Sequence, residues 1–248
     1  MRDLHVHTIY SDGENLPEEI VLMAIQKGMS EIGISDHSYT WFDESYCIRK
    51  DKIEEYKTEI ARLREKYKDQ IRVLCGVEQD YYSDEPTDDY DYVIGSVHYL
   101  MVDGAIAFVD ESPELFRQAI DVYFGGDVYA FAEKYYETVA DVVNKTGCDI
   151  IGHFDLFSKY NEDVRTGEKN IFFDPSHPRY VAAWKKAVDA LIPTGKLFEI
   201  NTGGMASGRK TDPYPSEEIQ NDIRLNGGAF IYSSDAHRAE NLCFRFEA

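Results

Sequence analysis

Short apolar runs alternate along the chain with longer segments in which apolar residues recur every three or four positions. The first pattern predicts β-strands and the second predicts amphipathic helices. Strands are expected at 3–7, 31–36, 72–78, 92–98, 149–153, 197–201 and 229–234. Helices are expected between them at 17–27, 51–67, 113–124, 128–145, 180–191 and 216–225.

Regular alternation of strands and helices predicts a parallel sheet covered by helices. Seven strands suit a closed or nearly closed barrel better than an open sheet, although periodicity alone does not establish closure. The Asp103-Gly104 pair between two apolar runs predicts a β-hairpin over 99–110. Gly28, Gly147 and Gly227 follow predicted helices and are expected to cap them.

Length and composition indicate one domain spanning residues 1–248, because 248 residues with 43% hydrophobic content can form a single barrel core. The formal charge of -20 disfavours binding to nucleic acid or to an anionic membrane surface. No segment approaches the roughly 20 apolar residues of a membrane span, and the first residues do not resemble a signal peptide. The four cysteines form no CxxC motif, so a cytoplasmic protein is expected.

Six of the seven histidines fall where predicted strands end. They are His5, His7, His37, His98, His153 and His237. In a parallel barrel these ends share one face, which is where barrel enzymes carry their active sites. The remaining histidine, His177, lies between two prolines and is expected to be a loop or helix-entry residue.

Three carboxylates, Asp12, Glu78 and Asp235, accompany these histidines near the strand ends. Together the nine side chains offer more nitrogen and oxygen donors than one ion requires, so two or three divalent metal ions are expected. The mixed histidine and carboxylate set suits zinc, iron or manganese. Asp36, directly before His37, is expected either to support a ligand or to have a structural role.

These motifs resemble the PHP (polymerase and histidinol phosphatase) superfamily. The resemblance is carried by His-Val-His-Thr at 5–8, Ser-Asp-His at 35–37, the strand-end Glu78 and Ser-Asp-Ala-His at 234–237. Within the superfamily, Gly-His-Phe-Asp-Leu-Phe-Ser-Lys-Tyr at 152–160, Glu-Ile-Asn-Thr-Gly-Gly at 199–204 and Pro-Tyr-Pro-Ser at 213–216 are most similar to the histidinol-phosphatase branch.

The resemblance implies a distorted (β/α)7 TIM-like barrel with a trinuclear metal site at the carboxyl ends of the strands. By the implied assignment, one metal is held by His5, His7, Glu78 and Asp235, a second by Glu78 as a bridge with His98 and His153, and a third by Asp12, His37 and His237. Members of the superfamily usually continue into a final helix after the last motif. This sequence ends at 246–248, so we expect either a truncated chain or a barrel that is partly uncovered there.

The function implied is that of a metal-dependent phosphomonoesterase, a histidinol-phosphatase that hydrolyses L-histidinol phosphate to L-histidinol and phosphate in histidine biosynthesis. A hydroxide bridging the metals would attack the phosphorus, with either Asp235 or His237 passing a proton to the leaving alkoxide. Alternatives are a PHP phosphoesterase for nucleotides or other small phosphate esters, and a metal-binding or proofreading module of a polymerase. The partner expected is a small phosphate ester, and the oligomeric state is left open.

Substrate contacts are expected from loops on the same face. Lys159 and Arg209 are the cationic candidates for binding phosphate, and Asn201 with the following glycines could offer polar and backbone groups. The acidic run at 80–91 could face the amine of histidinol. Stacking candidates for its imidazole are Tyr39, Trp41, Phe42 and Tyr99.

Overall fold

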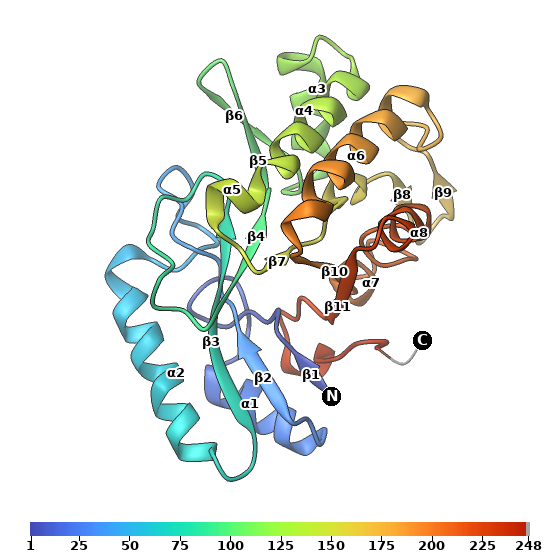
Figure 1. Cartoon of the computed structure of the whole chain (residues 1–248). Coiled ribbons are helices and arrows are strands. Elements are labelled where there is room, and N and C mark those ends of the chain that lie inside the picture. The colour runs from blue at the N-terminus through green and yellow to red at the C-terminus, as the bar shows by residue number, and fades with distance from the viewer. Residues whose placement is uncertain (247–248) are drawn as a thin grey trace.

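A computed structural model describes residues 1–246 and shows a barrel of parallel strands surrounded by helices (Figure 1). The strands of the main sheet are β1 (Arg2–Asp3), β2 (Glu31–Ile34), β3 (Arg72–Asp80), β4 (Tyr92–Ser96), β7 (Ile150–Ile151), β10 (Leu197–Asn201) and β11 (Ala229–Ser233). Their spatial order, β1-β2-β3-β4-β7-β10-β11, is their order in the sequence, and every neighbouring pair is parallel. The α/β barrel class predicted from alternation is therefore confirmed.

The barrel closes almost completely between its first and last strands. Just beyond β1 and β11, Val6 and Ala236 form a parallel bridge, and the amide of His7 donates to the carbonyl of Ala236 at 2.9 Å. Nearer the strand starts, the Asp3 carboxylate accepts from the amide of Ser234 at 3.1 Å. On the other side of β1, the amide of Val6 donates to the hydroxyl of Ser35 at 3.1 Å instead of to a main-chain carbonyl, and the ladder with β2 ends at Asp3, earlier than predicted.

The helices lie outside the barrel, as expected for crossover connections between parallel strands (Figure 1). They are α1 (Pro17–Gln26), α2 (Ile53–Tyr67), α3 (Pro113–Tyr123), α4 (Val128–Ala140), α5 (Val142–Thr146), α6 (Pro178–Leu191), α7 (Gly203–Ala206) and α8 (Glu217–Leu225). Short 3-10 turns occur at Lys50–Lys52, Leu156–Ser158, Ile192–Thr194 and Ala239–Asn241. Within residues 1–246, no helix is both long and apolar enough to cross a membrane.

Most predicted helix ends lie within two residues of the observed ones, and the short α7 was not predicted; two differences have a clear local cause. The single helix predicted over 128–145 is divided at Asp141, after the hydroxyl of Thr138 bonds back to the carbonyl of Lys134 at 3.0 Å, an interaction that often bends helices. The helix α6 begins earlier than predicted, at Pro178. There the ring of His177 accepts from the amide of Arg179 at 3.3 Å, which confirms His177 as a helix-entry residue.

The predicted hairpin is present as β5 (Tyr99–Val102) and β6 (Ala105–Phe108), joined by a two-residue turn. Asp103 and Gly104 both adopt positive φ, 51° and 82°, which such a turn requires. A second hairpin, β8 (Glu162–Asp163) with β9 (Glu168–Lys169), lies in the loop after β7. Its short, charged strands have no apolar alternation, so the sequence pattern did not reveal it.

Apolar side chains also fill the barrel interior beneath the ends of the strands. A small buried cluster there comprises Leu4, Tyr92, Ile94, Ile150 and Ile231. Tyr92 extends from β4 over Gly76 and Gly33, and its hydroxyl donates to the carbonyl of Leu4 at 2.5 Å. The absence of a side chain at both glycines makes room for the ring. These side chains together fill the barrel interior directly below His5, the first histidine of the His5 and His7 pair.

Candidate metal centre

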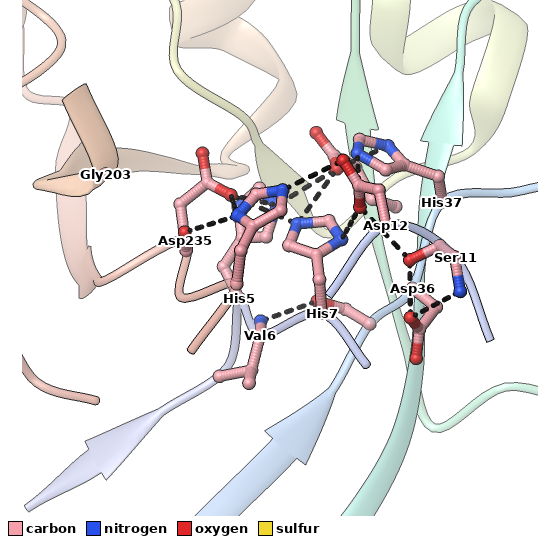
Figure 2. A network of polar contacts seen from close by, with 12 residues as sticks. His5, Val6, His7, Ser11, Asp12, Asp36, His37, Gly203 and Asp235 are labelled. Carbon is pink, nitrogen blue, oxygen red and sulfur yellow. Dashed lines mark hydrogen bonds and ion pairs between the residues drawn. The ribbon is translucent and has the colours of Figure 1, made fainter. Parts of the chain in front are cut away.

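The nine predicted ligands converge at the carboxyl ends of the strands, several of them visible together in Figure 2. The carboxylate of Glu78, at the centre, is buried and in contact with histidines from four other chain segments. Its Oε2 lies 2.9 Å from His37 Nδ1 and 3.1 Å from His5 Nε2. Its Oε1 lies 2.9 Å from His153 Nε2 and 3.4 Å from His98 Nε2.

The other two carboxylates extend the cluster toward solvent. Asp235 Oδ1 lies 3.0 Å from His7 Nε2 and 3.6 Å from His5 Nε2. Asp12 Oδ2 lies 3.1 Å from His237 Nε2, while the other ring nitrogen of His237 donates to the carbonyl of Asp235 at 3.0 Å. A carbonyl can only accept, so Nδ1 of His237 carries a proton, and Nε2 is the ring nitrogen that could bind a metal ion.

Three groups of these side chains bring their donor atoms within 4.8 Å of one another. The groups are His7, Asp12, His37 and His237; His5, His7 and Asp235; and His37, Glu78 and His98. His7 and His37 each belong to two groups, so the donors form one continuous cluster rather than three isolated sets.

Unsatisfied buried atoms also indicate an ion site. His5 Nε2, His37 Nδ1 and Glu78 Oε2 are buried and make no hydrogen bond, although they lie close to one another. Buried polar atoms normally have hydrogen-bond partners, and a cluster that lacks them calls for another explanation such as a bound ion. The residues therefore fit divalent metal ions in both donor chemistry and arrangement.

The charges in the cluster favour ionised carboxylates and a neutral ligand at one key position. Burial opposes ionisation of Glu78, but the fields of His37, His5 and His98 hold its pKa well below the usual range. Burial together with the fields of His237 and His37 lowers the pKa of His7 to about 4. At neutral pH the ring of His7 is therefore uncharged, the state in which histidine binds metals.

A cavity of about 340 Å³ opens directly above the cluster. Lys159 and Arg209 both line it, together with the glycines at 203 and 204. Lys159 Nζ is held by Asp110 Oδ2 at 3.0 Å. Asn201 is fully buried, and its side-chain amide donates to Asp235 Oδ2 at 3.2 Å, which places it below the cavity instead of in the wall.

The acidic and aromatic parts of the wall come partly from residues that the sequence pattern did not single out. The acidic run at 80–91 does not line the cavity; Asp110 and Glu111, which follow the β5–β6 hairpin, do. Tyr99 lines it as predicted, accompanied by Tyr46. Trp41 is 61% exposed and lies outside the lining.

Comparison with known protein families shows the family to which this chain belongs. The model of the PHP domain matches residues 3–203, more than three quarters of the chain. The chain belongs to the PHP domain family. This membership confirms the resemblance drawn from the strand-end motifs.

Relatives of this PHP chain extend over almost its whole length. A protein of Deinococcus radiodurans named "Probable histidinol-phosphatase" is 28% identical over 98% of this chain and 89% of its own. A solved structure from Listeria monocytogenes has a TM-score of 0.83 at 20% identity, covering 100% of this chain and 99% of its own. The Lactococcus lactis histidinol phosphate phosphatase, solved with zinc, L-histidinol and phosphate, has a TM-score of 0.67 at 22% identity, covering 96% and 86%. Both structures share the fold of this PHP barrel.

Three buried carboxylates of the PHP barrel support ligands without belonging to the predicted ligand set. Asp36 accepts from the amides of Thr8 at 2.7 Å and Ser11 at 3.1 Å, so it anchors the loop that carries Asp12 and has a structural role. Asp80 lies 3.3 Å from His98 Nδ1, and Glu199 lies 2.6 Å from His5 Nδ1. Spacing could have revealed both, because each stands two residues from a predicted site residue on the same strand.

Proposed function

We propose that this chain is a metal-dependent histidinol-phosphatase that hydrolyses L-histidinol phosphate to L-histidinol and phosphate. The observation that carries the proposal is the cavity, whose floor is a cluster of metal-binding groups and whose wall combines cationic and acidic side chains. The names of the Deinococcus radiodurans relative and of the Lactococcus lactis structure support the same substrate. We further propose that residues 1–248 form one domain, since a single barrel contains all seven parallel strands.

Two or three divalent ions, zinc, iron or manganese, would be held by the convergent donors. The proposed ligands are His5, His7, Glu78 and Asp235 for one ion, Glu78, His98 and His153 for a second, and Asp12, His37 and His237 for a third. Pairs of donor atoms assigned to the same ion lie close together, which supports this assignment: His153 Nε2 and Glu78 Oε1 at 2.9 Å, His5 Nε2 and Glu78 Oε2 at 3.1 Å, and His37 Nε2 and Asp12 Oδ1 at 3.7 Å. Bound divalent ions supply positive charge for a phosphate and lower the pKa of water toward neutrality.

Lys159 and Arg209 are the proposed phosphate-binding residues. Both line the cavity, and Asp110 holds the ammonium group of Lys159 in place at 3.0 Å. No ion pair engages Arg209 among residues 1–246, so its planar guanidinium is available to bind two phosphate oxygens at once.

The leaving alkoxide must receive a proton, and Asp235 and His237 are the proposed donors. Both line the cavity. The side chain of His237 is 39% exposed and that of Asp235 is 18% exposed, so both can meet a group that enters from the cavity. Separate His237→Gln and Asp235→Asn variants, compared by the pH dependence of kcat, would identify the donor.

The organic half of the substrate carries an amine and an imidazole, and the cavity wall offers side chains for both. Glu111, next to the Asp110 that holds Lys159, places a carboxylate in the wall where a cationic amine would be stabilised. Tyr46 and Tyr99 present aromatic surfaces for the imidazole ring, and the hydroxyl of Tyr99 is held by Asp43 at 3.0 Å.

A substrate panel tests the function. The metal-loaded protein is expected to release phosphate from L-histidinol phosphate at least about tenfold faster, in kcat/KM, than from nucleoside monophosphates, a difference of about 1.4 kcal/mol. The reverse preference would assign a different phosphate ester, and no release from any ester would exclude a phosphatase. His98→Ala and His153→Ala variants provide the control: wild-type turnover and metal content in both would contradict the proposed site.

A further inference from the structure

Glu199 lies in the middle of β10, the one strand of the barrel that contributes no proposed metal ligand. Its side chain is fully buried. A buried carboxylate is strongly disfavoured unless other groups compensate its charge with hydrogen bonds. The hydrogen-bond partners of Glu199 therefore indicate the role of its carboxylate.

Each oxygen of Glu199 engages a different part of the candidate site. Oε1 accepts from His5 Nδ1 at 2.6 Å. Oε2 accepts from the main-chain amide of His153 at 2.8 Å and from the side-chain amide of Asn201 at 3.1 Å. The same Asn201 amide donates to Asp235 Oδ2 at 3.2 Å. One carboxylate thus links residues that come from three different strand ends.

The bond to His5 decides which of its ring nitrogens is free. An ionised carboxylate can only accept hydrogen bonds, so Nδ1 of His5 must carry the proton. The lone pair of the neutral ring then resides on Nε2, the atom that faces Glu78 Oε2 at 3.1 Å. A carboxylate behind a metal-binding histidine commonly fixes the ring in this way and raises its basicity.

The bond to the amide of His153 acts on the main chain instead of on a ring. The strand β7 ends at Ile151, so no ladder of strand hydrogen bonds holds His153. Glu199 provides that anchor, and the ring of His153 extends from it to within 2.9 Å of Glu78. The carboxylate therefore fixes a ring orientation in one ligand and a backbone position in another.

Asp80 shows the same arrangement on the opposite side of the cluster in a weaker form. Its Oδ2 lies 3.3 Å from both the ring Nδ1 and the amide nitrogen of His98. These contacts involve one ligand only. Glu199 differs because it reaches two ligands directly and a third, Asp235, through Asn201.

We propose that Glu199 is a positioning residue that pre-organises His5, His153 and Asp235 for metal binding without contacting the ion itself. This inference rests on the proposed ligand set. It predicts that the residue governs metal affinity while leaving substrate recognition to the cavity wall, which Glu199 does not line.

The Glu199→Gln variant tests the proposal because neither orientation of the amide can reproduce the carboxylate. If its oxygen faces His5, its NH2 group meets the donors of His153 and Asn201. If its NH2 group faces His5, the ring must move its proton to Nε2 and loses the free electron pair there. We expect the affinity for zinc, measured by competition with a chromophoric chelator, to fall about 10- to 100-fold.

Two further measurements separate positioning from a general structural effect. Nitrogen-15 NMR of the zinc-loaded protein should show His5 protonated at Nδ1 and bound to the metal through Nε2 in the wild type, and a changed protonation pattern of this ring in the variant. At saturating zinc, KM for the phosphate ester should remain near the wild-type value. A metal affinity and a His5 tautomer both unchanged in a folded Glu199→Gln protein would overturn the inference.

Asp155→Asn is the matched control. Asp155 is also a buried carboxylate, and its Oδ2 accepts from the amide of Ser216 at 3.0 Å with no bond to a ligand side chain. Its zinc affinity should equal that of the wild type, and an equal loss in both variants would show a general effect of removing buried charge. If Glu199→Gln does not fold, Glu199→Asp keeps the charge but is too short to reach both partners. Wild-type zinc affinity in that variant would likewise refute the proposal.

The zinc measurement needs no substrate, so its outcome is independent of whether histidinol phosphate is hydrolysed. Reduced zinc affinity in a protein that hydrolyses a different ester would retain the inference and reject the proposed function. Normal zinc affinity in an active histidinol-phosphatase would do the opposite.

Discussion

Replacing Gly33 with alanine is expected to destabilise the barrel through Tyr92. A β-carbon at position 33 would meet the hydroxyl oxygen of Tyr92 and the ring carbon that bears it, both closer than real β-carbons ever approach other atoms. The ring must therefore shift. The shift would break its hydrogen bond to the carbonyl of Leu4, the residue directly before His5.

Two costs and one smaller gain set the magnitude of the loss in stability. Overpacking a well-packed core costs about 1–3 kcal/mol. Loss of one buried hydrogen bond adds about 1 kcal/mol, and slightly better strand formation by alanine offsets part of the sum. We therefore expect a loss of roughly 2–3 kcal/mol in the free energy of unfolding, which for a chain of this length lowers Tm by roughly 4–12 °C.

Chemical and thermal unfolding of the metal-free protein, followed by circular dichroism, would measure this loss, because bound metals would otherwise change the apparent stability. In a Tyr92→Phe background the same substitution should cost at least about 1 kcal/mol less, since the obstructing hydroxyl and its bond are already gone. Gly76→Ala is the comparison: its β-carbon meets ring carbons that phenylalanine retains, so the rescue should be smaller. A Tm for Gly33→Ala within about 1 °C of the wild type would refute the packing argument.

Other changes probe the site and its surroundings. Removing metals with a chelator should abolish phosphate release and lower Tm, because the ions bind only the folded state. Zinc or manganese should restore both the activity and Tm. Activity in a protein shown to be metal-free by elemental analysis would contradict this expectation. Lys159→Met should lower kcat/KM roughly 10- to 100-fold, mainly through KM, by removing a charged hydrogen bond to phosphate, and a change below about twofold would exclude that contact. Glu111→Gln should reduce the preference for histidinol phosphate over esters that lack an amine, measured as a ratio of kcat/KM values; an unchanged ratio would exclude Glu111 from amine recognition. Burial raises the pKa of Asp155 to about 6, whereas an unfolded aspartate titrates near pH 4. Ionisation of Asp155 therefore destabilises the metal-free fold as pH rises from about 4 to 6. Asp155→Asn should therefore be more stable than the wild type by roughly 1–3 kcal/mol at pH 8 and equal to it near pH 4, and equal stability at both pH values in urea titrations would contradict the shift.

Much of the fold follows from short-range pattern. Apolar runs located all seven strands of the sheet, and the Asp103-Gly104 pair located a hairpin turn because both residues tolerate positive φ. The ends of β1 and β7 were placed too far along the chain, since the side chains of Ser35 and Glu199 accept hydrogen bonds from main-chain amides there in place of carbonyls of the neighbouring strand. Such replacement depends on residues distant in sequence, which no local period can reveal.

The metal-binding donors were also predictable, for a topological reason. Parallel strands bring their carboxyl ends to one face, so residues such as His5, Glu78 and Asp235 had to converge once the fold was parallel. Their pairing was not predictable in the same way. The sharing of His7 and His37 between neighbouring donor groups depends on ring orientations that only the packed barrel defines.

The sequence by itself thus determined the family, the barrel class and the set of groups available to bind metals, because residue type and strand position suffice for these. Only the tertiary structure decided that the barrel closes at Val6 and Ala236, that Asp110 and Glu111 supply the acidic wall, and that Glu199 stands behind His5. These contacts join segments far apart in the chain. Their geometry depends on the register and tilt of the strands, and a linear pattern of hydrophobic and polar residues does not contain that information.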